Sequence, residues 1–132
     1  MGVLGDMSFK ENDPLFVKIE RFKTLVKSKA YDGVAFHRVI KDKLVQAGDL
    51  EFGRKGNIDY GKIGTGKSGL GTIKSEIDKE FDYSKGSVGL ARTQKYNTED
   101  SQFFIILQDE PLYEGEFTPI AVSYTHLPSP RD

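Results

Sequence analysis

The clearest hydrophobic pattern along the chain lies between residues 13 and 29, where apolar side chains recur every three or four positions. These positions are Phe16, Ile19, Phe22, Leu25 and Val26. The spacing places them on one face of an α-helix. Asp13 suits the N-cap and Pro14 the first helical position. The pattern therefore predicts one amphipathic helix over residues 13–29, ending near Ala30.

Beyond this helix the apolar runs are short. VAFHRVI (34–40), GSVGLAR (86–92) and SQFFIIL (101–107) are rich in β-branched and aromatic residues, which favour strands. A polar loop, TQKYNTED, separates the last two runs. The first run, as a strand, would carry a guanidinium in line with apolar side chains on one face, namely Val34, Phe36, Arg38 and Ile40.

Alternation also divides the run 101–107 between two faces. Phe103, Ile105 and Leu107 share one face, and Phe104 and Ile106 share the other. We expect at least one of the two phenylalanines to belong to the core.

The segment from Gly53 to Gly71 contains seven glycines, and it reads as a loop or as very short strands joined by turns. Helices do not alternate regularly with the strands. The order of elements predicts a mainly β, antiparallel architecture, either a closed barrel or a sandwich, with a helix over one opening.

Composition narrows the class of protein. A chain of 132 residues with 37% hydrophobic and 30% charged residues is expected to form one globular domain. A net charge of -1 gives no basic field for nucleic acid. No apolar stretch approaches the length of a membrane span, and the first residues lack the features of a signal peptide. The prediction is a cytoplasmic protein without nucleic-acid or membrane partners.

Metal and thiol chemistry have little support in the sequence. The chain has no cysteine, which removes disulfides and thiolate ligands. Its two histidines, His37 and His126, are too far apart to have metal-ligand spacing. We expect neither a metal nor a cofactor.

The stretch GKIGTGKSG, residues 61–69, matches two phosphate-binding patterns. A phosphate loop, however, follows a buried strand and opens a helix. LEFGRKGNIDY, which precedes the stretch, is not an apolar strand, and Gly69 and Gly71 would fall in the first helical turn. The run FFIILQD could mimic a magnesium-binding strand, but the chain lacks the repeated βαβ units of such folds. A surface loop is the better interpretation.

Four separated motifs resemble the cyclophilin-type peptidyl-prolyl isomerases. In chain order they are YDGVAFHRVI with VQAGD, KGSVGLAR, SQFFIIL and EGEFTPI. The resemblance runs from about residue 13 to residue 120. It implies a closed antiparallel barrel of eight strands capped by helix, and catalysis of cis/trans isomerisation at X-Pro bonds. In that family the GTG segment is a loop near the active face.

The resemblance also implies site residues. Arg38 matches the catalytic arginine. Gln46 and Gln102 match glutamines that orient the substrate, and Phe104 matches the floor of the proline pocket. The remaining pocket or rim positions are Leu44, Ala91, Arg92, Tyr113 and Phe117, with Arg92 offering backbone hydrogen bonds to an extended peptide. The implied partners are proline-containing peptides or unfolded protein clients, and the protein is expected to be a monomer without a cofactor.

An arginine suits this reaction chemically. Resonance creates a barrier of ~18–20 kcal/mol to rotation about a peptide bond. At the twisted transition state the prolyl nitrogen regains a lone pair, so a fixed donor aimed at it binds the transition state better than either planar state. Arginine stays charged and holds its donors in a rigid fork.

Other interpretations of these residues remain open. From the strand pattern alone, Arg38 would be a surface arginine in an ion pair and Gln46 a hydrogen-bonded structural group. His37 is expected to be structural, because the reaction transfers no proton. Lys43 stands where the family has a pocket phenylalanine. This difference motivates a second hypothesis, a proline-peptide binding module with little or no turnover.

The two ends of the chain carry separate expectations. GDMSFK resembles at best a remnant of the family's first strand. VSYTHLPSPRD, residues 122–132, resembles the translation of a sequencing adaptor. We expect an isomerase domain over residues 1–121, lacking N- and C-terminal strands of the family, and a non-native tail over 122–132.

Overall fold

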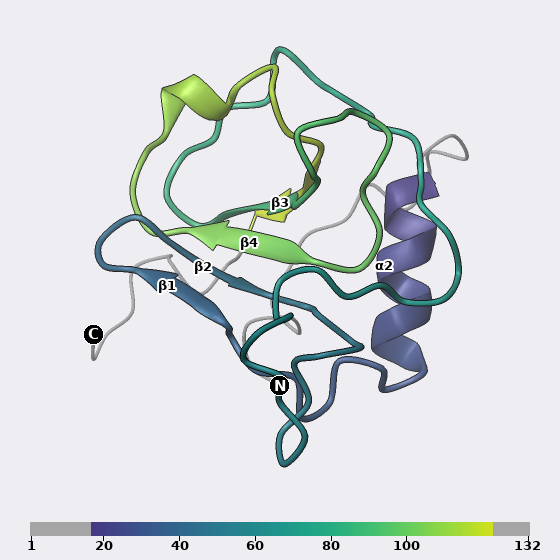
Figure 1. The fold of residues 1–132 in the computed structure, drawn as a ribbon. Helices are drawn as coiled ribbons and strands as arrows, with labels where there is room; N and C mark the ends of the chain where they lie inside the picture. Colours follow the sequence, from purple (N-terminus) through teal and green to yellow (C-terminus); the bar gives the residue numbers. More distant parts are fainter. Residues whose placement is uncertain (1–16, 123–132) are drawn as a thin grey trace.

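The computed structural model describes residues 17–122. Its helix is α2 (Val17–Lys27), and a 3-10 turn, η1 (Pro111–Tyr113), lies late in the chain. Five strands form one antiparallel sheet in the order β1-β2-β4-β3-β5 (Figure 1). The strands are β1 (Arg38–Ile40), β2 (Leu44–Ala47), β3 (Ser87–Leu90), β4 (Phe103–Ile106) and β5 (Pro119–Val122).

The strand register sets the rows of side chains that cross the sheet. Arg38 pairs with Gln46, Gln46 with Phe104, and Phe104 with Gly89. Residues paired across neighbouring strands point to the same face. The sheet therefore aligns an arginine, a glutamine and a phenylalanine in one row.

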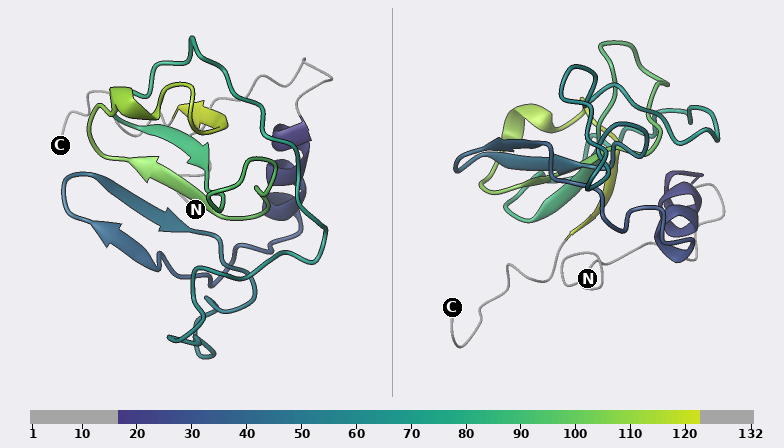
Figure 2. Two further views of the ribbon diagram at one scale, coloured as in Figure 1. Left: turned by 45° about the horizontal axis from the view of Figure 1, so that its top comes forward. Right: turned by 60° about the horizontal axis from the view of Figure 1, so that its bottom comes forward.

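One face of the sheet packs against α2, which lies beside it in both views of Figure 2. Phe22 from the helix contacts Tyr31 and Phe103, with ring centroids 5.5 and 5.3 Å away. Ile105 and Val88 extend this cluster along the sheet. The Phe22–Phe103 contact is T-shaped, an arrangement that aromatic rings prefer in protein cores.

A second, smaller cluster lies on the opposite face. Its buried members are Leu44, Tyr83, Phe104 and Ile106. Phe103 and Phe104 are therefore both buried, one in each cluster, and the alternation predicted for residues 101–107 is confirmed for the four residues of β4. Burial on both faces explains why FFII reads as a continuous apolar run.

The predicted elements match the structure with adjusted ends. The helix occupies residues 17–27, and its proposed cap at Asp13 and Pro14 lies outside the described residues. The first strand is shorter than the run 34–40, because Val34 makes only an isolated bridge to Arg54. The sheet gains β5, which hydrophobic periodicity did not predict. This strand ends at Val122, whose backbone pairs with Ser87.

The glycine-rich segment is a loop, as predicted, with no strand between residues 53 and 71. Within residues 17–122, β1 and β5 lie at the two edges of the sheet and do not pair with each other. No helix in this part of the chain is long and apolar enough to cross a membrane. The GDMSFK segment (residues 5–10) and all but the first residue of the predicted tail lie outside the described residues.

Candidate active site

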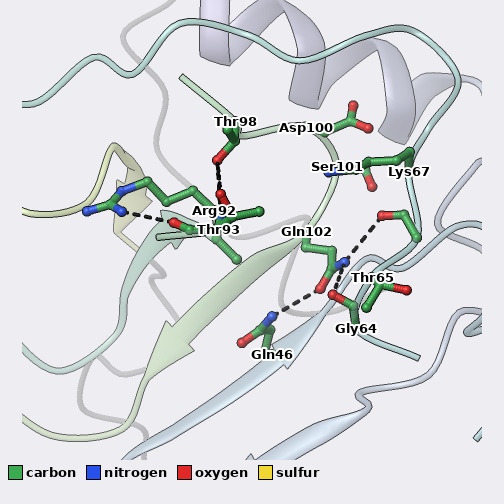
Figure 3. A pocket seen from close by; sticks show the side chains of 12 residues that line it. Gln46, Gly64, Thr65, Lys67, Arg92, Thr93, Thr98, Asp100, Ser101 and Gln102 are labelled. Carbon is green, nitrogen blue, oxygen red and sulfur yellow. Dashed lines mark hydrogen bonds between the residues drawn. The ribbon is translucent and has the colours of Figure 1, made fainter. Parts of the chain in front are cut away.

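A chain of polar side chains runs from β1 across the sheet. An Nη atom of Arg38 donates to Oε1 of Gln46 at 3.3 Å, and Nε2 of Gln46 donates to Oε1 of Gln102 at 3.0 Å. Nε2 of Gln102 then donates to the carbonyl oxygens of Gly64 and Gly66 at 3.0 and 3.3 Å. Figure 3 shows the two glutamines facing each other, with the glycine-rich loop beyond them.

These hydrogen bonds fix the direction of each amide. Gln102 uses its N–H groups on the loop, so its oxygen faces Gln46, and Gln46 in turn presents its oxygen to the arginine. Arg38 is exposed. Within residues 17–122, no carboxylate forms an ion pair with it. The guanidinium is oriented by a neutral group and keeps its full charge for a ligand.

Aromatic side chains surround the end of this row. Phe104 is 4% exposed, and its ring centroid lies 5.7 Å from that of Tyr113 and 5.3 Å from that of Phe117. Tyr83 stacks beneath at 6.2 Å. Leu44 belongs to the same cluster, and Ala91 packs against it. An apolar surface formed by half-buried rings over a buried floor therefore lies beside the polar chain.

The absence of a side chain at Gly89 allows the Phe104 ring to pack against β3. A Cβ at this position would lie 2.5 Å from the Cζ of Phe104 and 2.9 Å from the hydroxyl of Tyr83. The ring of Phe104 thus lies directly against the backbone of β3, which only glycine permits.

Lys43 lies at the edge of the aromatic cluster. Its Nζ is 5.9 Å from the centroid of the Tyr113 ring. The ammonium thus lies within cation–π distance of the ring.

A polar pocket of about 210 Å³ adjoins the glutamines (Figure 3). Its lining residues come from three separate segments, namely Gln46, Gly64, Thr65, Gly66, Lys67, Ala91, Arg92, Thr93, Thr98, Asp100, Ser101 and Gln102. The sequence offered no reason to select the three threonines Thr65, Thr93 and Thr98, and Thr98 was expected to belong to an ordinary loop. No local pattern marks them, because the pocket forms only when the three segments meet.

Four backbone N–H groups of the glycine-rich loop already donate hydrogen bonds to carboxylates of the protein itself. Gly64 and Gly66 donate to Oδ2 of Asp49 at 2.7 and 3.0 Å. Lys67 donates to Glu51, and Ser68 donates to Asp100. A phosphate loop needs such groups free to face an anion. The GKIGTGKSG match to a phosphate site therefore has no structural support.

We expect no measurable binding of ATP or GTP, because binding would require these four hydrogen bonds to break. Isothermal titration with each nucleotide, with and without Mg²⁺, tests this. Saturable binding that the Lys67→Ala variant abolishes would restore the nucleotide hypothesis.

His37 lies next to the site without joining its hydrogen bonds. Both ring nitrogens are buried and have no partner among the described residues. Burial lowers the pKa of His37, the nearby Asp49 carboxylate acts in the opposite direction, and the charge of Arg38 lowers the pKa further. The lowered pKa favours the neutral ring at pH 7, and the structural role expected from the sequence stays a prediction. Residues 17–122 contain no group of three or more side chains placed to hold a metal ion.

Comparison with known proteins points to one family. The sequence model described as cyclophilin type peptidyl-prolyl cis-trans isomerase/CLD matches residues 9–122. A probable peptidyl-prolyl cis-trans isomerase of Brucella abortus is 40% identical over 119 residues, covering 88% of this chain and 60% of the relative. A peptidyl-prolyl cis-trans isomerase of Arabidopsis thaliana is 35% identical over 98 residues, covering 74% of this chain and 54% of the relative.

A solved structure has a similar fold. It is a cyclophilin type peptidyl-prolyl cis-trans isomerase of Cryptosporidium parvum, determined in the presence of the dipeptide Ala-Pro. The TM-score is 0.66 at 28% identity, with 79% of this chain and 62% of that chain covered. The chain thus spans only about three fifths of the length of these relatives.

Proposed function

Because the chain belongs to the cyclophilin-type peptidyl-prolyl cis-trans isomerases, we propose that it accelerates rotation about X-Pro bonds in peptides and unfolded protein clients. The observation that carries this proposal is the row formed by Arg38, Gln46 and Phe104. Strand register brings a cation, an amide and an aromatic ring into one row, and this supports the proposal.

In the proposed mechanism the proline ring lies against Tyr113 and Phe117, above Phe104, with Leu44 and Ala91 completing the apolar surface. The guanidinium of Arg38 donates to the prolyl nitrogen once that nitrogen loses conjugation with the carbonyl. Gln46 holds the guanidinium in place, and the hydrogen bond to Gln102 keeps Gln46 in its orientation. No bond to the substrate forms and no proton moves, so neutral His37 has no chemical step.

The backbone next to the site can hold the rest of the peptide. We assign this role to the main chain of Arg92, which follows β3 between the aromatic cluster and the polar pocket. An extended peptide there would use main-chain hydrogen bonds as an added strand does.

We also propose that the protein has the family's closed eight-stranded barrel. Residues 1–121 then form one domain, and the protein acts as a monomer in the cytoplasm. Light scattering of the purified chain tests the oligomeric state directly.

Exchange NMR on a short X-Pro peptide tests the proposed activity. Uncatalysed isomerisation takes tens to hundreds of seconds, so cis–trans exchange peaks on the one-second timescale at substoichiometric protein would establish catalysis. Shifted peptide resonances without exchange peaks would instead support the binding-module hypothesis. That second candidate rests on the cation of Lys43 beside Tyr113.

The Lys43→Phe variant is expected to have a higher kcat/KM for prolyl peptides. A phenylalanine would add apolar contact beside Tyr113 worth roughly 1 kcal/mol, which corresponds to about a fivefold gain. The Lys41→Phe variant, altered at an exposed position of the same turn, is the matched control. Equal efficiency of Lys43→Phe and the parent chain would show that Lys43 does not weaken binding of the proline ring to the aromatic cluster.

A further inference from the structure

Arg92 makes side-chain contacts that its backbone role does not require. Its side chain is 8% exposed. The guanidinium carbon lies 4.1 Å from the centroid of the Tyr96 ring and 5.0 Å from that of Phe117. Both distances fall within the range of cation–π contacts, which are strongest where the cation is shielded from water.

Hydrogen bonds fix this guanidinium between two loops. One Nη atom donates to the carbonyl oxygen of Glu116 at 2.7 Å, and the other donates to that of Thr93 at 3.0 Å. The loop that follows β3 is thereby joined to the segment that precedes β5. The hydroxyl of Tyr96 reaches the Glu116 carboxylate at 3.4 Å, a weaker second link between the same loops.

Phe117 connects this arrangement to the aromatic cluster. Its ring centroid is 5.0 Å from that of Tyr113 and 5.3 Å from that of Phe104. The same ring is in contact with the Arg92 guanidinium. A shift of Arg92 would therefore free Phe117 to move relative to the other two rings.

We infer that Arg92 is a positioning residue that sets the width of the proline slot by holding Phe117 in place. This inference rests on the proposed function, because it assumes that Phe104, Tyr113 and Phe117 receive the proline ring. A slot of fixed width fits a five-membered ring and disfavours its six-membered homologue, pipecolic acid. Loss of the Arg92 side chain should relax this preference in addition to weakening binding.

The test compares Arg92→Ala and Arg92→Lys with the parent chain. Affinity for an Ala-Pro peptide and for its Ala-pipecolyl counterpart is measured by NMR titration, and turnover of the prolyl peptide by exchange NMR. We expect Arg92→Ala to bind the prolyl peptide about five- to tenfold more weakly, the order of loss for a shielded cation–π contact. The pipecolyl peptide should lose clearly less affinity. KM should therefore rise more than kcat falls.

Arg92→Lys keeps the charge but not the planar fork, so its ring selectivity should lie between those of the parent and Arg92→Ala. Arg54→Ala is the control, since Arg54 also donates to a backbone carbonyl but lines a separate pocket and not the one beside the glutamines. It should leave both affinities unchanged. Thermal melting of each variant identifies unfolding, and if Arg92→Ala does not fold, the selectivity of Arg92→Lys decides.

Equal losses for the two peptides, or no loss for either, would overturn the role assigned to Arg92 while leaving the proposed function intact. Peptide binding by the parent chain without turnover would refute the proposed catalysis, yet the affinity ratio would still report on Arg92. Failure of the parent chain to bind the prolyl peptide would overturn both.

Discussion

The Arg38→Ala variant is expected to lose about 10²–10³ in kcat, the usual cost of removing a donor that acts on developing charge, with a much smaller change in KM. The reason is that the proposed hydrogen bond to the prolyl nitrogen exists only in the twisted state, where the lone pair is available. In the planar ground state, peptide binding depends on the aromatic cluster and on main-chain contacts. Removing Arg38 therefore affects the transition state selectively.

Exchange NMR at several peptide concentrations separates the two parameters. Arg38→Lys should recover only part of the activity, because an ammonium keeps the charge but cannot hold the fork that Gln46 orients. Arg54→Ala controls for the loss of a positive charge from the molecule. If Arg38→Ala keeps the turnover of the parent chain, Arg38 has no part in the mechanism.

Local sequence patterns predicted those parts of the fold that depend on periodicity. The helical spacing of Phe22 and Leu25 places both in the core, and alternation divides Phe103 from Phe104 as expected. These predictions succeed because the side-chain period follows from backbone geometry alone. The observed strand is shorter than the predicted run 34–40, because only the last three residues of that run pair with a neighbouring strand.

The link between Arg38, Gln46 and Gln102 could not be derived from periodicity. Arg38 and Gln46 face each other because β1 and β2 form a hairpin in one particular register. Gln102 joins them from a position 56 residues further along the chain than Gln46. The motif resemblance selected all three residues, but their hydrogen bonds depend on tertiary structure.

The hydrogen bonds that orient Gln102 could not be predicted from the sequence for a related reason. Its amide is held by the carbonyl groups of Gly64 and Gly66, and these glycines are held by Asp49, which sequence analysis had not singled out. A Cβ on Gly66 would overlap the Asp49 carboxylate. The glycines that suggested a phosphate site therefore allow close approach to a buried side chain of the protein itself.

The carboxylate of Asp49, which follows β2, holds this loop through hydrogen bonds to its backbone. The Asp49→Asn variant is expected to lower the free energy of unfolding by about 2–5 kcal/mol. Oδ1 of Asp49 accepts the N–H groups of Glu51 and Phe52, and Oδ2 accepts those of Gly64 and Gly66. An asparagine keeps one oxygen and turns an NH₂ group toward the other pair of donors. Each donor left without an acceptor costs roughly 1–3 kcal/mol. Urea unfolding at pH 7 measures the difference.

The exposed Asp59, which accepts the N–H of Gly61 at 3.0 Å, offers a matched control. Asp59→Asn should change stability by well under 1 kcal/mol, since its donor can bond to water. Asp49→Asn should also reduce turnover of the folded protein, because a displaced loop removes the carbonyl groups that orient Gln102. Similar stabilities of Asp49→Asn and the parent chain would show that the loop does not depend on this carboxylate.

The contribution of the Asp49 carboxylate to stability should also depend on pH. Burial would raise the pKa of Asp49, but the N–H groups of Phe52, Gly66, Gly64 and Glu51 outweigh it and lower the pKa below its usual value. Stabilisation by the carboxylate is then complete above the unfolded-state pKa of about 3.9, and it is lost as the pH falls through the lower folded-state pKa. The stability gap between the parent chain and Asp49→Asn should consequently narrow below about pH 4. A gap that stays constant from pH 7 to pH 2 would mean that the charge of Asp49 contributes nothing and that only the shape of its side chain matters.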